Sequence, residues 1–98
     1  MKWTVEEDEI CCRACVDEYV INKSHMNVEF CIKLIMNNPK IKRDSGTLKM
    51  RIQNIKAILD EWKVPNTLNI SPLNHTGQQT KAVLREILKE HNIEIPLA

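Results

Sequence analysis

The stretch from position 40 to position 56 is rich in basic and amide side chains, the groups that bind phosphates and base edges of nucleic acids. Gly46 lies in this stretch between Ser45 and Thr47, and such small residues allow close approach to a DNA backbone. The candidate DNA contacts of the chain are Lys40, Lys42, Arg43, Ser45, Thr47, Lys49, Arg51, Gln53, Asn54 and Lys56.

These candidates divide by the chemistry of their side chains. Lys49 or Arg51 could bind guanine and Gln53 or Asn54 adenine in a major groove, whereas the basic residues before Ser45 would hold phosphates. Replacing Arg51 or Gln53 by alanine should then weaken DNA binding and leave thermal unfolding nearly unchanged. The alternative is a solvated polar face on an ordinary bundle helix.

The charge of the chain is unevenly distributed, although its net value is only +1. Residues 1–30 carry three basic and seven acidic side chains, and residues 31–63 carry eight basic and three acidic ones. Residues 64–98 carry three of each kind. A basic middle third is the electrostatic footprint expected for phosphate contacts, although a solvated basic face gives the same count.

The four cysteines raise the question of a metal site or a disulfide. Cys12 and Cys15 form one C-x-x-C pair without a second pair, and His25 is the one histidine between Cys15 and Cys31. Adjacent cysteines within a helix are poor disulfide partners, and free cysteine is among the most buried residue types. We therefore predict buried thiols, with no metal ion and no cofactor.

Catalytic chemistry has little support in the sequence. His25, His75 and His91 stand apart, without an H-x-x-x-H pair, and no glycine-rich phosphate loop is present. The acidic run over residues 6–9 is typical of the first turn of a helix, where carboxylates favour the positive end of the dipole. The chain is predicted not to be an enzyme.

The elements that would position these residues are helices. Thr4 with Glu7 predicts a capping box that starts a first helix, which continues to about Ile21. A second helix is expected from about Asn27 to about Asn37, before a proline. Its predicted inner stripe consists of Val28, Cys31, Ile32, Ile35 and Met36.

The third helix carries most of the candidate contacts. Asp44 or Ser45 can cap it, and Pro65 marks its end. A fourth helix is expected to about Glu90, with a capping box formed by Thr76 and Gln79. The core stripe predicted for the third helix consists of Leu48, Ile52, Ile55, Leu59 and Trp62.

This pattern predicts an all-α fold in one domain over residues 1–98. Residues 2–63 would form a three-helix helix-turn-helix core, and residues 64–98 a connector plus a C-terminal helix. No apolar run reaches the roughly 20 residues that span a bilayer, so no membrane partner is expected. The acidic N-terminal stretch lacks the pattern of a secretion signal, which predicts a cytoplasmic protein.

Two motifs give the chain a family resemblance. The opening Trp3-Thr4-x-Glu6-Glu7-Asp8 and the run from Ser45 to Ile55 resemble Myb/SANT-type domains. They are closer still to the small helical domain beside HNH nuclease domains in bacterial restriction-like proteins. The resemblance implies sequence recognition by the third helix. The residues it carries over to that role are Ser45, Thr47, Lys49, Arg51, Gln53 and Asn54.

Two departures from these relatives limit what the resemblance implies. The chain has no room for the nuclease module, and it lacks the evenly spaced tryptophans of eukaryotic Myb repeats. The expected function is a duplex-DNA-binding regulator, bacterial or phage in type, or the specificity module of a larger system. Because one short domain binds DNA weakly, a homodimer or a larger protein partner is expected. The alternative is a protein-interaction module, or a small inhibitor of a nucleic-acid enzyme, without DNA contact.

Overall fold

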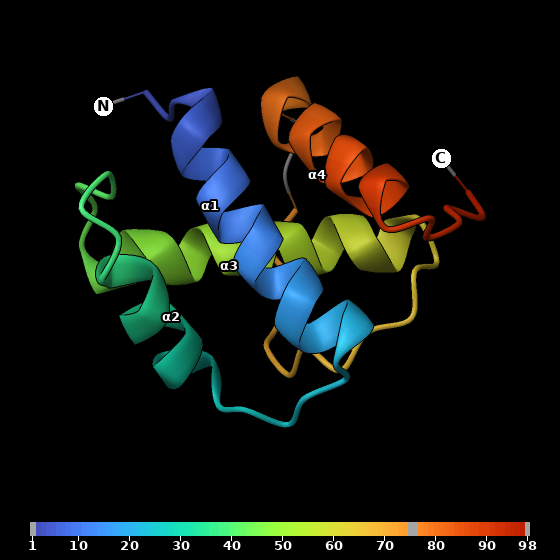
Figure 1. Cartoon of the computed structure of the whole chain (residues 1–98), viewed down its shortest axis with the longest axis horizontal. Coiled ribbons are helices and arrows are strands. Elements are labelled where there is room, and N and C mark those ends of the chain that lie inside the picture. The colour runs from blue at the N-terminus through green and yellow to red at the C-terminus, as the bar shows by residue number, and fades with distance from the viewer. Residues whose placement is uncertain (1, 75–76, 98) are drawn as a thin grey trace.

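The computed structural model describes residues 2–74 and 77–97, and the secondary structure in these ranges is helical, with no strand. The elements are α1 (Val5–Cys15), η1 (Val16–Ile21), α2 (Val28–Met36), α3 (Ser45–Glu61) and α4 (Gln78–Glu90). In Figure 1, α1 and α4 lie side by side across α3, and α2 packs near the start of α3. The all-α prediction is confirmed.

The first helix begins as its sequence predicts. The Thr4 side chain accepts a hydrogen bond from the Glu7 amide at 3.1 Å, and the Glu7 carboxylate accepts one from the Thr4 amide at 3.0 Å. This capping box satisfies backbone donors that have no partner within the helix. The helix then continues as one π-helical segment, η1, which ends at Ile21. Lys23, two residues later, has a left-handed backbone conformation (φ 50°).

The second helix differs from its predicted pattern at one position. Asn27 caps it, and its inner stripe of Val28, Cys31, Ile32 and Ile35 is buried. Met36, expected in that stripe, is 45% exposed, so this part of the prediction is wrong. At 100° per residue, Met36 lies about 80° from Val28 around the helix, beyond the buried face.

The third helix is the central element of the bundle. Its N-cap is Asp44, whose carboxylate accepts the Thr47 amide at 2.8 Å. The predicted core stripe is confirmed, because all of its members are buried against the other helices: Leu48, Ile52, Ile55, Leu59 and Trp62. The helix therefore has its position fixed by packing along nearly its whole length.

The connection between α2 and α3 covers the eight residues 37–44. A compact helix-turn-helix unit joins its two helices by a turn of about three or four residues. The connection of this chain is longer than that turn, although α2 and α3 are in contact. The Myb/SANT-like helix-turn-helix arrangement therefore stays a prediction.

The fourth helix runs beside α1 in the same direction (Figure 1). Near its start, Gln79 donates to the Trp3 carbonyl at 3.0 Å, and at its end Glu90 accepts from Arg13 at 3.0 Å. Gly77 is its N-cap, without a side-chain bond, whereas the predicted cap Thr76 lies outside the described residues. No helix of the described ranges is long and apolar enough to cross a bilayer.

Candidate nucleic-acid interface

The structure separates the predicted DNA contacts into exposed residues and residues held by the protein itself. The exposed ones are Lys40, Lys42, Ser45 and Lys49. The ones that are buried or half-buried are Arg43, Thr47, Arg51, Gln53, Asn54 and Lys56. The basic and amide groups of α3 therefore do not form one continuous exposed reading face.

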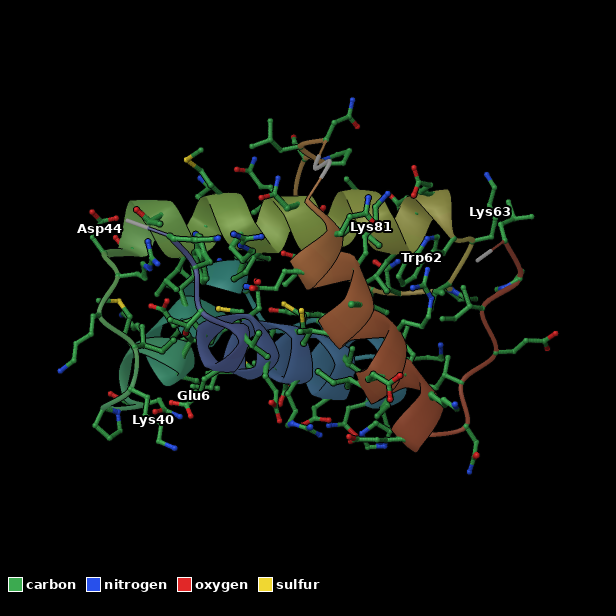
Figure 2. All side chains as sticks on the ribbon, turned by 90° about the horizontal axis from the view of Figure 1, so that it is seen from above. Glu6, Lys40, Asp44, Trp62, Lys63 and Lys81 are labelled. Atoms are coloured by element: carbon green, nitrogen blue, oxygen red, sulfur yellow. The ribbon has the colours of Figure 1, made fainter. Side chains whose placement is uncertain are left out.

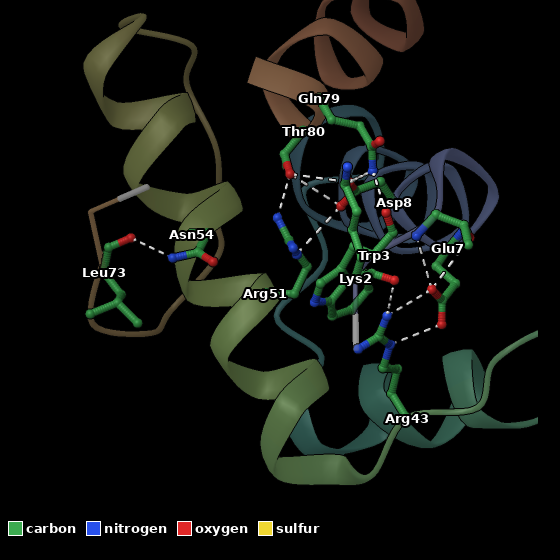
Figure 3. Close-up of polar contacts among 11 residues, drawn as sticks. Lys2, Trp3, Glu7, Asp8, Arg43, Arg51, Asn54, Leu73, Gln79 and Thr80 are labelled. Atoms are coloured by element: carbon green, nitrogen blue, oxygen red, sulfur yellow. Dashed lines mark hydrogen bonds and ion pairs between the residues drawn. The ribbon is translucent and has the colours of Figure 1, made fainter. Parts of the chain in front are cut away.

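Arg51 is the largest correction. Its side chain lies inside the bundle, with the residue only 8% exposed, instead of on the predicted polar face. Its Nε lies 3.4 Å from Asp8 Oδ1, and its Nη1 donates to the Thr80 hydroxyl (Figure 3). A guanidinium engaged in this way has an internal role, so Arg51 is removed from the candidate base contacts.

Asp8 is the centre of this internal network and was missed at the level of sequence. It is fully buried, and it accepts hydrogen bonds from the Thr80 hydroxyl at 3.2 Å and from Gln79 Nε2 at 2.8 Å (Figure 3). Together with Arg51 these bonds join α1, α3 and α4. A buried carboxylate needs such partners, because removing it from water without them is costly.

Arg43 is the second basic residue that the protein uses internally. Its Nε and Nη2 donate to the two carboxylate oxygens of Glu7 at 2.9 and 3.0 Å, and Nη2 also donates to the Lys2 carbonyl at 2.8 Å. The Arg43 hydrogen bonds are the largest cause that lowers the pKa of Glu7 to about 2. Arg43 therefore anchors the segment before α3, and its prediction as a phosphate clamp is corrected.

Trp3 connects the two internal arginines. The guanidinium of Arg43 lies 4.5 Å from the ring centroid of Trp3, and that of Arg51 lies 4.2 Å from it (Figure 3). A cation over an aromatic face is attracted by the ring quadrupole. The indole thus contacts two cations, and it also packs against the apolar core.

The connector after α3 covers the middle of that helix. The Leu73 amide donates to the Gln53 carbonyl at 3.1 Å, and Asn54 Nδ2 donates to the Leu73 carbonyl at 2.8 Å (Figure 3). Asn54 therefore uses its amide donor within the protein, and its reading of a base stays a prediction. The Gln53 residue itself is half-buried.

The two remaining half-buried candidates are held by local contacts. Lys56 Nζ lies 3.2 Å from Asp60 and 3.1 Å from the Asn66 side-chain oxygen, so its charge is directed towards the connector. Thr47 is half-buried in the first turn of α3, where its amide is occupied by Asp44. Both residues are partly covered by the protein, and their DNA contacts stay predictions.

The exposed candidates are close in sequence to the start of α3. Lys42 and Ser45 lie on either side of the cap residue Asp44 in sequence, and Lys49 follows one helical turn after Ser45. Lys40 Nζ lies 3.5 Å from Glu6 Oε2, and the Lys40 side chain is 62% exposed. Figure 2 shows Lys40 and Asp44 at one end of the molecule and Lys63 at the other. We call the exposed set Lys40, Lys42, Ser45 and Lys49 the basic end.

The thiols are buried, as the sequence predicted. Cys11, Cys12, Cys15 and Cys31 have no measurable exposure and form no disulfide. Burial raises the pKa of Cys11 to about 12. Among the residues that the structure describes, no group of three or more His, Cys, Asp or Glu side chains is arranged to hold a metal ion.

Comparison with known proteins adds no relative. The chain gives no significant match to protein-family models, to curated protein sequences or to solved structures. What the fold defines is a small four-helix protein with a buried polar network. The Myb/SANT-like resemblance stays a prediction from its motifs.

Proposed function

We propose that this chain binds duplex DNA through the backbone phosphates, using the basic end. The observation that carries the proposal is the exposure of Lys40, Lys42 and Lys49 around the first turns of α3, beside the hydroxyl of Ser45. Lysine ammonium groups and small hydroxyl residues are common phosphate contacts, and they fix a protein on the duplex without reading its sequence.

The hydrogen bonds and ion pairs that engage the arginines within the protein are the reason that we propose DNA binding of low sequence specificity. Arg43 and Arg51 are engaged with Glu7 and Asp8, and Asn54 is bonded to the connector. Three candidate side chains suited to bidentate base contacts are therefore engaged within the protein. We expect binding of low sequence specificity, with dissociation constants on the order of 10⁻⁴ to 10⁻⁶ M at physiological salt.

The test compares two charge-matched double variants. Lys42→Gln with Lys49→Gln removes two cations from the basic end, and Lys63→Gln with Lys89→Gln removes two from other parts of the surface. Fluorescence anisotropy of a labelled 20-base-pair duplex would be measured over a range of salt concentrations. The first variant should bind more weakly and reduce the salt slope by about 1.8, because each phosphate contact contributes roughly 0.9.

The control variant should retain the affinity and the salt slope of the wild-type protein. Equal loss in both variants would mean that only net charge matters, which would contradict a defined contact surface. If the wild-type protein fails to bind the duplex even at low salt, the DNA proposal is rejected. The alternative of a protein-binding module without DNA contact would then replace it.

A further inference from the structure

An apolar groove lies between α1 and α4, on elements that the proposed DNA contact does not use. It has a volume of about 330 Å³, and its apolar lining residues are Val5, Ala82, Val83 and Ile87. Val5 is 57% exposed in the first turn of α1, and Ala82 is exposed on α4. A row of apolar side chains left accessible between two helices is a common binding surface for a third helix.

The rim of this groove is acidic. Glu9 of α1 and Glu86 and Glu90 of α4 line it, and Arg13 is its one basic lining residue. Arg13 contacts Glu9 at 3.1 Å and Glu90 at 3.0 Å, so its single charge is shared between two carboxylates. The rim therefore keeps a net negative charge that favours a cationic ligand.

We infer that the groove binds an amphipathic helix of a protein partner, with apolar side chains on one face and Lys or Arg beside them. The part of α1 that lines the groove, from Val5 to Arg13, is about 12 Å long at 1.5 Å per residue. That length accommodates anchors at positions i, i+4 and i+7 of a bound helix, which span about 10.5 Å. The acidic rim supplies the specificity for basic flanking residues.

Charge also argues against other occupants. A symmetric dimer through this groove would bring two acidic rims together, which is unfavourable. The acidic rim repels DNA phosphates as well. The inference therefore requires a partner surface of opposite charge, and it is independent of whether the basic end binds DNA.

The experiment uses two fluorescent 16-residue helical peptides that share a Leu/Ala face and differ in carrying Lys or Glu on the flanks. Each is titrated with the full chain by fluorescence anisotropy. The Lys peptide should bind at least about tenfold more tightly than the Glu peptide, because the rim is acidic. Ala82→Glu, which fills the groove at an exposed position, should lower the affinity for the Lys peptide by about tenfold or more.

The matched control is Leu34→Glu, which makes the same charge change on the exposed face of α2 and should leave peptide binding unchanged. Ala82→Glu adds a negative charge that by itself would attract the Lys peptide, so a loss of binding reports the filled groove. Equal affinity for both peptides, no effect of Ala82→Glu, or no binding at about 1 mM protein would each overturn the inference. The inference would also be overturned if the chain self-associated in sedimentation equilibrium and if both Ala82→Glu and Leu34→Glu abolished that association. The occupant of the groove would then be α2 of another copy.

Discussion

Two guanidinium groups and one indole ring hold the N-terminal segment against the rest of the bundle. Arg43 and Arg51 lie over the Trp3 ring, and each also pairs with a carboxylate of the first turns of α1. Charged groups with these contacts are removed from water only because their partners replace its hydrogen bonds. The same residues that looked suited to DNA are therefore stabilising contacts within the protein.

The burial of Arg51 predicts a large effect on stability. Arg51→Ala leaves the Asp8 carboxylate buried without its cation, which should lower the free energy of unfolding by roughly 3–5 kcal/mol. Lys49→Ala, on the same helix but exposed, should change it by less than about 0.5 kcal/mol. Urea denaturation followed by circular dichroism measures both. Similar midpoints for the two variants would show that the ion pair contributes little to the fold.

A second variant separates the charge from the packing. Asp8→Leu combined with Arg51→Met replaces both charges by apolar groups, and it should recover most of the stability lost in Arg51→Ala. No recovery would indicate that the bonds from Thr80 and Gln79 to Asp8 matter more than the ion pair.

At the scale of single residues, the sequence contained a signal for the Asp8–Arg51 ion pair. Asp8 precedes Cys11, Cys12 and Cys15 at three-, four- and seven-residue spacing, so it lies on the buried stripe of its own helix. A carboxylate on such a stripe needs a buried donor, and Arg51 borders the core stripe of α3. Which basic residue would meet it depends on how α1 crosses α3, and that crossing is set by packing rather than by local pattern.

At the scale of elements, the Glu7–Arg43 pair links the start of α1 to the connector before α3. Glu7 completes the capping box of α1 and receives two bonds from Arg43. One carboxylate thereby fixes a helix end and a connection that is distant in sequence. The orientation of the eight-residue connection depends on the ionised form of this group.

This link predicts a defined pH dependence. The pKa of Glu7 falls from 4.5 to about 2 on folding, so its stabilisation is fully present above pH 4.5 and is lost as the pH falls through about 2. Glu7→Gln should be less stable than the wild type at pH 7 by roughly 2 kcal/mol, and the difference should shrink between pH 4.5 and 2. Thermal unfolding at several pH values measures it, with the exposed Glu94→Gln as control. A difference that stays constant with pH would exclude ionised Glu7 as the cause.

The elements themselves followed from the sequence more fully than their connections did. Capping at Thr4 and Asp44 and the apolar spacing of α3 are local features, and the structure confirms them. The approach of Leu73 to Asn54 was not predicted, because it joins segments that local periodicity does not relate. That contact is why a helix with the composition of a DNA reader has its middle covered.

At the scale of the whole molecule, opposite charges occupy different elements. Cations gather at the start of α3, whereas the groove between α1 and α4 is rimmed by carboxylates. Under the two proposals above, these surfaces would select ligands of opposite charge. One core joins the two surfaces, with buried residues from every helix.

That shared core provides a probe of whole-molecule opening through its thiols. All four cysteines are buried, and burial raises the pKa of Cys12, so the native protein should react with a disulfide reagent far more slowly than the denatured chain. Monitoring reagent absorbance at pH 8, we expect all four thiols to react slowly in the native protein and rapidly once urea has unfolded the chain. Rapid native reaction of all four thiols would show that the core opens readily, and then neither surface would be held in place by it.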